Sequence, residues 1–262
     1  MSTTRRLLLT ALPKVPLSRL TGLLTSAPVP GFARAPFYRW FAGRYGAELD
    51  DVAAELSSFR SLQAFFRRAL KPDARPVADA ALVWPCDGRV VTAGRIRGGR
   101  IPQVKGNDYA LRDLLDDAEL AEALEGGEQA TVYLAPGDYH RVHCPFDGEV
   151  LGTKAIGGTL FPVNPPAVRC IDELFVRNSR HVFRCTTREG APAAVVMVGA
   201  YNVGGTLLTA EAGPVARGQE LGQFGFGSTV VFAVGPGGPP LAPAEPEQRV
   251  RMGEAASATH PR

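Results

Sequence analysis

The residues with the chemical capacity for catalysis gather in three short clusters. The first contains Asp87, the second contains His140 and His143, and the third contains Gly227 and Ser228. An aspartate, a histidine and a serine are the parts of a nucleophilic triad, in which the carboxylate orients the imidazole and the imidazole takes the hydroxyl proton. Ser228 follows a glycine, which tolerates a strained backbone, so the sequence predicts that this serine attacks the carbonyl group just before it.

Each cluster by itself also has a structural explanation. Asp87 precedes a glycine, a pair that is typical of a turn between strands. His140 and His143 have a spacing that would suit a metal on a helix, but Pro136 favours an extended segment and no carboxylate or thiol has a matching spacing. We therefore expect no metal site, and the prediction of a triad depends on the three clusters together.

The bulk composition excludes several classes of protein. With 262 residues, of which 45% are hydrophobic, the chain can bury a substantial core and is not disordered as a whole. The net charge of +3 is too small to indicate nucleic-acid binding. The four cysteines form no C-x-x-C pair, which argues against a zinc knuckle or a dithiol redox site and fits free thiols.

Charge and aromatic residues are distributed unevenly along the chain. No Asp or Glu occurs before Glu48, whereas six arginines, one lysine and six aromatic residues do. Cations and rings beside leucines suit the headgroup region of a membrane, so residues 1–47 are predicted to be a helical, membrane-associating prefix. Leu17, Leu20 and Leu24 form a helical apolar stripe in this prefix. The alternative is a pair of amphipathic helices packed on the domain. No apolar run reaches the roughly 18 to 20 residues that span a bilayer.

The rest of the chain is predicted to be an α+β domain with a tail. Residues 48–71 carry apolar side chains at helical spacing, with Ser61 as the N-cap. After them, short Val- and Ile-rich runs alternate with turns, which predicts a β-rich core of sandwich or barrel type with one inserted helix at 111–124. Residues 48–235 would form this domain, and the Pro-, Gly- and Glu-rich residues 236–262 are expected to be disordered.

The three clusters belong to a longer series of motifs. In chain order these are Phe65-Phe66-Arg67-Arg68-Ala69-Leu70-Lys71-Pro72 with Arg75-Pro76, Pro85-Cys86-Asp87-Gly88, Lys105-Gly106-Asn107-Asp108-Tyr109, Asp138-Tyr139-His140-Arg141-Val142-His143, Gly158-Thr159-Leu160-Phe161-Pro162-Val163-Asn164, Val198-Gly199-Ala200 and Phe226-Gly227-Ser228-Thr229-Val230. With this series, which spans residues 55–235, the sequence resembles the phosphatidylserine decarboxylase family of the bacterial, membrane-associated kind. One segment departs from the family pattern, because Asn178-Ser179-Arg180-His181 stands where the family usually has Asn-Glu-Arg-Val.

The resemblance implies a proenzyme that cuts itself between Gly227 and Ser228, which gives a β chain of residues 1–227 and an α chain of residues 228–262. His143, oriented by Asp87, would take the proton of Ser228, and Ser228 would become a covalent pyruvoyl cofactor.

The implied substrate is a lipid. The pyruvoyl ketone would form a Schiff base with the amine of phosphatidylserine and act as the electron sink for its decarboxylation to phosphatidylethanolamine and CO2 in phospholipid biosynthesis. His140 would donate a proton or position the substrate carboxylate. The resemblance also implies a homodimer, attached peripherally to the anionic cytoplasmic face of the inner cell membrane and without a nucleic-acid partner.

Three other functions stay open on the sequence alone. The chain could be a pyruvoyl-dependent decarboxylase of a soluble amino acid, although the cationic prefix argues against that. It could be a non-enzymatic lipid-binding module, although Asp87, His143 and Ser228 are all retained. It could also be a self-cleaving hydrolase that stops at the ester and keeps its serine.

Overall fold

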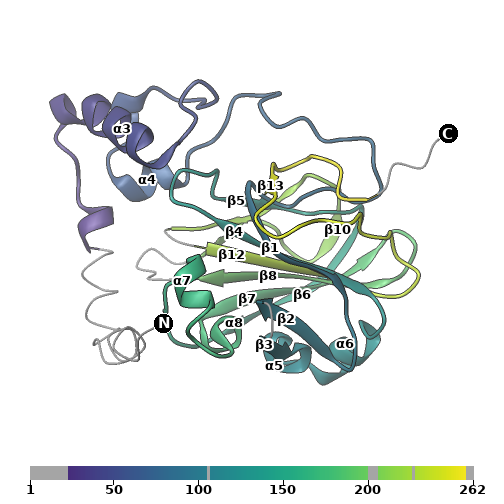
Figure 1. The fold of residues 1–262 in the computed structure, drawn as a ribbon. Helices are drawn as coiled ribbons and strands as arrows, with labels where there is room; N and C mark the ends of the chain where they lie inside the picture. Colours follow the sequence, from purple (N-terminus) through teal and green to yellow (C-terminus); the bar gives the residue numbers. More distant parts are fainter. Residues whose placement is uncertain (1–22, 105–106, 200–205, 226–227, 258–262) are drawn as a thin grey trace.

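An antiparallel sheet of eight strands runs through the middle of the molecule (Figure 1). The computed structural model describes residues 23–104, 107–199, 206–225 and 228–257. Within them the strand order of this sheet is β10-β6-β7-β8-β12-β4-β1-β13. In chain order its members are β1 (Gly88–Arg95), β4 (Glu128–Leu134), β6 (Gly148–Ile156), β7 (Arg180–Thr187), β8 (Pro192–Gly199), β10 (Gly213–Val215), β12 (Ser228–Val234) and β13 (Arg249–Val250).

Smaller elements complete the fold. A three-stranded sheet has the order β5-β11-β9, and a hairpin pairs β2 with β3. These strands are β2 (Arg100–Val104), β3 (Asn107–Ala110), β5 (Arg141–His143), β9 (Leu207–Leu208) and β11 (Glu220–Gln223). The helices are α3 (Gly31–Tyr45), the 3-10 helix η1 (Leu56–Ser58), α4 (Leu62–Phe66), α5 (Leu111–Leu115), α6 (Ala118–Ala123), α7 (Pro165–Val168) and α8 (Leu174–Arg177).

Two hydrophobic cores cover the two faces of the large sheet. Side chains alternate along β12, so that Val230 and Phe232 belong to one core while Val231 and Ala233 belong to the other. The first core includes residues of the β5-β11-β9 sheet, and the second includes residues of α5 to α8. All seven residues of β12 are therefore buried. The predicted α+β fold with a β-rich core is confirmed, and the four cysteines are free as expected.

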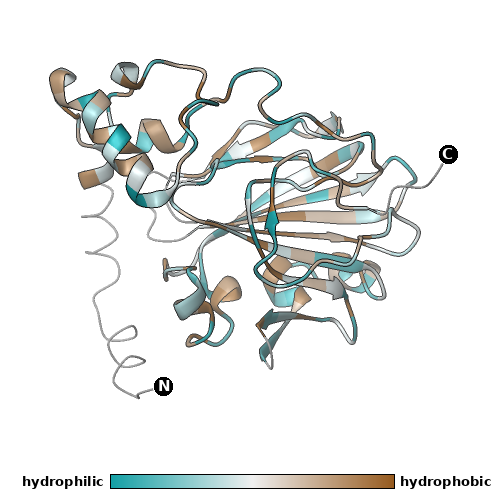
Figure 2. Ribbon diagram, turned by 45° about the horizontal axis from the view of Figure 1, so that its top comes forward, coloured by the Kyte–Doolittle hydropathy of each residue, from teal (hydrophilic) through white to brown (hydrophobic). Residues whose placement is uncertain are grey.

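A third core joins α3 and α4, which lie together at one end of the molecule (Figure 1). Rings dominate it, and Tyr38 stacks on Phe65 with ring centroids 4.7 Å apart. Figure 2 shows hydrophobic residues in this helical unit as well as along the strands. In the predicted helical prefix, Leu24 is exposed, whereas Leu17 and Leu20 lie outside the described residues.

The expectation of a helix over residues 48–71 is only partly correct, because helical structure there is confined to η1 and α4. Val52 bridges to Leu70, and the backbone N–H of Lys71 donates to the carbonyl of Asp51 at 2.8 Å. This closure makes the segment double back, so Phe59, which follows η1, meets Phe65 of α4 with ring centroids 5.5 Å apart. The expected N-cap is confirmed, since the Ser61 hydroxyl accepts from the N–H of Ala64.

The predicted inserted helix at 111–124 is present as two short helices, α5 and α6. Asp116 takes a left-handed conformation with φ of 49°, which ends α5. The side chain of Asp117 then caps α6 by accepting from the N–H of Leu120 at 3.0 Å. An aspartate that bonds a local backbone group starts a new helix in preference to continuing the old one.

The tail also differs from the expectation of disorder, because residues 236–257 lie against the large sheet. β13 pairs with β1, and the N–H groups of Trp84 and Ala256 each bond across the contact, to Glu254 and Leu82 respectively. Val250 and Ala256 are buried in the first core. The prolines and glycines of the tail form turns along the edge of the sheet. Burial of a few apolar side chains such as Val250 and Ala256 stabilises the ordered tail, although many of its other residues are polar.

Asn178 connects the helical side of the molecule to the end of β8. Its side-chain amide donates to the carbonyls of Phe161 and Gly199 at 2.8 and 2.9 Å, and its oxygen accepts from the N–H of Phe161 at 2.9 Å. Gly199 pairs with Ser228, so this buried amide fixes the strand beside Ser228. The neighbouring Ser179, which departs from the family pattern, uses its hydroxyl only to donate to Gly158 among the described residues.

We expect Asn178→Leu to lower the free energy of unfolding by about 3 kcal/mol, because three buried backbone groups lose their partners. Urea unfolding measures this change. Ser179→Ala is the control, since it removes one exposed hydrogen bond and should shift stability by less than about 0.5 kcal/mol. An Asn178→Leu variant as stable as the wild type would show that these buried groups find other partners.

Candidate active site

Ser228 opens β12 at the centre of the large sheet. It pairs with Leu134 of β4 on one side and with Gly199 of β8 on the other. Its side chain is fully buried, and its Oγ has no hydrogen-bond partner among the described residues. Buried hydroxyls nearly always have a partner, so the Ser228 hydroxyl, like those of Tyr109 and Thr229, is an exception among the described residues. Gly227, the other half of the predicted cleavage site, lies outside the described residues.

His143 ends β5 and has both ring nitrogens engaged. Nδ1 lies 2.9 Å from the carbonyl oxygen of Gly218, and Nε2 lies 3.3 Å from the hydroxyl of Tyr139. A carbonyl can only accept, so Nδ1 carries the proton and Nε2 presents its lone pair to Tyr139. Burial lowers the pKa of His143 below its ordinary value, although the bond to Gly218 opposes this. His143 is therefore neutral near pH 7, which is the form that a general base requires.

His140 is the most deeply buried histidine of the described chain. Its Nδ1 lies 2.8 Å from the carbonyl oxygen of Asp138, which fixes the neutral tautomer, and its Nε2 has no partner among the described residues. Burial lowers its pKa to about 3. The ring meets Phe66 edge-on with centroids 4.8 Å apart. The carbonyl of His140 also accepts from the N–H of Phe224, which ties it to the segment that leads to Ser228.

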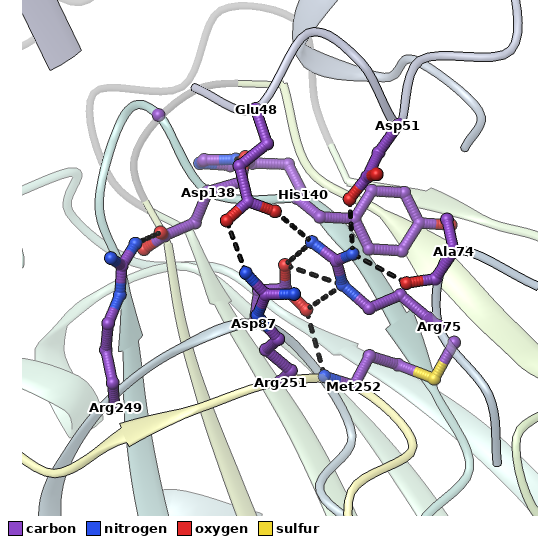
Figure 3. A network of polar contacts seen from close by, with 12 residues as sticks. Glu48, Asp51, Ala74, Arg75, Asp87, Asp138, His140, Arg249, Arg251 and Met252 are labelled. Atoms are coloured by element: carbon purple, nitrogen blue, oxygen red, sulfur yellow. Dashed lines mark hydrogen bonds and ion pairs between the residues drawn. The ribbon is translucent and has the colours of Figure 1, made fainter. Parts of the chain in front are cut away.

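Asp87 stands directly before β1, in contact with a buried arginine (Figure 3). Nη2 of Arg75 lies 2.6 Å from Oδ2 of Asp87, and Nε lies 3.0 Å from each carboxylate oxygen. The backbone N–H of Met252 donates to Oδ1 at 2.9 Å. The sequence alone assigns no role to Arg75, because an arginine within a motif does not reveal which carboxylate it will contact in the fold.

The fold brings two of the predicted site residues, Asp87 and His143, close together. The N–H of His143 donates to the carbonyl of Pro85 at 2.8 Å, so β5 runs beside the segment that carries Asp87. Asp87 also acts on His143 through its charge, as the weakest of the influences that raise the histidine pKa. Among the described residues, no hydrogen bond joins Asp87 to His143 or either of them to Ser228. The triad thus stays a prediction, in which Asp87 and His143 lie on adjacent segments and Ser228 lies at the head of β12. No cluster of metal-binding residues occurs in the described part of the chain.

Arg68 supports the turn before the two histidines. Its guanidinium is buried and donates to the carbonyls of Gly137 and Asp138 at 2.9 and 3.1 Å. Burial lowers its pKa to about 10, so it keeps its charge near pH 7. The carbonyl of Asp138 accepts from both Arg68 and His140, which links the helical unit to the position of the imidazole.

Comparisons with known proteins agree with the motifs. The sequence model of the family described as phosphatidylserine decarboxylase matches residues 62–258. The phosphatidylserine decarboxylase proenzyme of Anaeromyxobacter sp. (strain K) is 43% identical over 93% of this chain and 94% of that protein. The proenzymes of the same name from Chromobacterium violaceum and Alcanivorax borkumensis are 39% and 38% identical, over 93% and 92% of this chain and 95% and 91% of those proteins.

Acid should destabilise the fold partly through His140. Its pKa is about 3 in the folded chain and 6.5 in an ordinary imidazole, so between these values the unfolded chain binds a proton that the folded chain does not. The stabilisation that comes from a neutral His140 is complete above the pKa of the unfolded chain. It is lost as the pH falls toward the pKa of the folded chain. We expect His140→Asn, whose amide can still donate to Asp138, to reduce the pH dependence of the unfolding free energy by up to about 1.4 kcal/mol per pH unit.

Urea unfolding at a series of pH values, in the uncleaved Ser228→Ala background, measures this dependence. An identical pH dependence with and without His140 would contradict the assignment of a neutral, buried imidazole.

Proposed function

The chain belongs to the phosphatidylserine decarboxylase family, and from that premise we propose that it cuts itself before Ser228 and decarboxylates phosphatidylserine with the group that the cut creates. The observation that carries this proposal is the Ser228 hydroxyl, which is fully buried at the head of the central strand and has no partner among the described residues. Asp87, His140 and His143 supply the carboxylate and the neutral imidazoles that such chemistry needs.

His143 and Ser228 carry out the first step in this proposal. The Tyr139 hydroxyl turns away from Nε2 of His143, which then takes the proton of Ser228. Oγ bonds to the carbonyl carbon of Gly227 as the peptide C–N bond breaks, and the proton passes to the released amine. Asp87 stabilises the imidazolium that exists between these two events.

The ester formed in this way is then eliminated. Loss of the Cα proton of residue 228 and cleavage of its Cβ–Oγ bond release the chain that ends in the carboxylate of Gly227. The enamine that remains takes up one water and loses ammonia, which leaves a ketone at the new terminus. The two products are a β chain of residues 1–227 and an α chain of residues 228–262.

A pyruvoyl group suits the position of Ser228. The pairing with Leu134 and Gly199 holds the backbone, and burial keeps bulk water away from the reacting atoms. When formed, this group binds a primary amine through its ketone and accepts the electron pair that loss of CO2 leaves behind. His140 is proposed to move a proton at Nε2, because a pKa of about 3 leaves it without the charge that would bind a substrate carboxylate.

The α chain remains bound after the cut in this proposal. It contributes β12, which pairs with β4 and β8 along its full length, and the tail that lies on β1. The homodimer implied by the family resemblance is kept as a proposal, and no nucleic-acid partner is proposed.

Exposed rings on the helical unit favour a lipid over a soluble amino acid as substrate. Phe32 is 90% exposed and Trp40 is 61% exposed, and Arg39 and Arg44 are exposed beside them. Rings and cations of this kind suit the headgroup region of an anionic membrane. We therefore propose peripheral attachment to the cytoplasmic face of the inner cell membrane, through the prefix of residues 1–47. In the part of the chain that the structure describes, no helix has the length and apolarity to span a bilayer.

Intact-mass spectrometry tests self-cleavage. The wild type should give two chains, and the fragment of residues 228–262 should be lighter than a serine-terminated fragment by one ammonia. Ser228→Ala should stay whole, and His143→Asn should cleave on the order of 100-fold or more slowly, as expected for loss of a general base. His181→Asn is the control histidine and should cleave normally. A wild-type chain that stays whole in the presence of lipid vesicles would refute the proposal.

A pair of surface substitutions tests membrane attachment. We expect Phe32→Ser with Trp40→Ser to weaken binding to vesicles of phosphatidylethanolamine and phosphatidylglycerol on the order of 100-fold, because two aromatic side chains lose their apolar environment. Vesicle sedimentation measures the binding. Leu151→Ser with Leu207→Ser is the matched control, since these side chains are 51% and 47% exposed on β6 and β9. Unchanged binding of the aromatic variant would rule out α3 as the attachment surface.

A further inference from the structure

The carboxylate of Asp87 is held from two sides by groups that lie far apart in the sequence (Figure 3). Arg75 supplies Nε–H and Nη2–H, and the backbone of Met252 supplies a third donor. A carboxylate has about four acceptor positions, so these three donors leave one free. The bidentate contact with a guanidinium also fixes the plane of the carboxylate, which a single bond would not do.

Arg75 is itself fixed by other groups. Its side chain is only 7% exposed, and its Nη1 donates to Asp51 at 2.7 Å and to the carbonyl of Ala74 at 2.8 Å. Nη2 lies 3.2 Å from Glu48. Burial opposes its charge, but the hydrogen bonds to Asp87 and Asp51 hold the pKa of Arg75 above its ordinary value. Arg75 is therefore a permanent cation whose position is set by the segment that follows α3.

The second contact comes from the tail of the chain. Residues 251–254 form a turn in which the N–H of Glu254 donates to the carbonyl of Arg251 at 3.1 Å and Gly253 has φ of 86°. A positive φ at the third position alone defines a type II turn, with Met252 at the second position. The N–H of Gly253 donates to Trp84, and Arg251 forms an ion pair with Glu48. The tail is thus bonded both to the segment before Asp87 and to the partner of Arg75.

We propose that Arg75 and the backbone N–H of Met252 are positioning groups for self-cleavage, which hold the charge of the Asp87 carboxylate in place so that it stabilises the imidazolium of His143. This inference rests on the proposed function, in which Asp87 stabilises that imidazole. It adds that the C-terminal tail completes the site, so the future α chain contributes at both of its ends, through Ser228 and through Met252.

The geometry explains why two holding groups are present. A buried carboxylate that lost its cation would be uncompensated in a low-dielectric site and would move or take up a proton. Arg75 prevents this by charge, and the Met252 N–H prevents rotation about the arginine contact. Because a displacement of about 1 Å can reduce the rate of a positioned reaction on the order of 100-fold, a small loss of order at Asp87 has a large kinetic effect.

The first test removes the guanidinium. Arg75→Ala should cleave on the order of 100-fold more slowly than the wild type in a denaturing-gel time course, because Asp87 is no longer positioned. Arg75→Lys should stay slow, since an ammonium cannot make the two parallel bonds. Arg184 lies on β7 and pairs with Asp117, away from Asp87, so the control variant Arg184→Ala should cleave normally.

Chemical rescue separates positioning from a structural role. Guanidinium ions at a low, non-denaturing concentration should restore part of the cleavage rate of Arg75→Ala, and sodium chloride at equal ionic strength should not. Asp87→Asn, run beside it, should stay slow with and without guanidinium. Arg75→Ala that melts like the wild type and cleaves at the wild-type rate beside a slow Asp87→Asn would overturn this inference alone. Normal cleavage by Asp87→Asn would instead remove Asp87 from the proposed function.

The second test acts on the tail and does not depend on Arg75. The second position of a type II turn favours proline, so Met252→Pro keeps the turn while it deletes the N–H that Asp87 accepts. Met252→Ala loses the same buried side chain and keeps the N–H. We expect the proline variant to cleave at least about tenfold more slowly than the alanine variant, because it loses one charge-assisted hydrogen bond to Asp87. The two variants should have equal melting temperatures. Equal cleavage rates would overturn the assignment of Met252.

Discussion

The structure depends on one constraint, which is that the strand beginning at Ser228 is buried on both faces in the middle of the sheet. β12 separates two hydrophobic cores, and its neighbours β4 and β8 bond to it along its whole length. A residue at the head of such a strand cannot be placed by a flexible loop, because its backbone is held by two partners. If the chain is cut before Ser228 as proposed, the pairing of β12 with β4 and β8 would keep Ser228 in register without the peptide bond.

Two buried polar side chains, Asn178 and Arg180, hold the surroundings of this strand by bonding to backbone groups. Asn178 binds Phe161 and Gly199, and Arg180 donates to the carbonyls of Asp113 and Leu114, each at 2.6 Å. Side-chain bonds of this type satisfy buried backbone groups in loops, which have no helix or strand partner to do so. They also account for the departure at Ser179, because the two neighbours that make the long-range bonds, Asn178 and Arg180, are both retained.

Sequence patterns predict the parts of this molecule whose structure is set locally. Short Val- and Ile-rich runs predict strands, of which β12 is one, and the position of Ser61 before apolar residues predicts its N-cap. Residues 48–71 and the tail at 236–257 show the limit of this reasoning. The first closes on itself through the Val52 bridge to Leu70, and the second orders itself on β1 and on the Asp87 segment. The composition of a segment shows how many of its residues can be buried. It does not show which surface of the folded protein those residues will pack against.

The same limit applies to the site. Asp87, His143 and Ser228 are chemically conspicuous, so they can be selected from one sequence. Arg75 and the Met252 N–H cannot, since one is a common surface residue type and the other is a backbone group without a side-chain signature. The reacting residues of such a site can be recognised by type, whereas the groups that position them are known only from the fold. Arg75 bonds to Glu48, and the Met252 N–H belongs to the tail. The Asp87 carboxylate is therefore in place only when the segment after α3 and the C-terminal tail have both docked. Self-cleavage, which cannot be reversed once ammonia is lost, would then begin only in a chain that has finished folding.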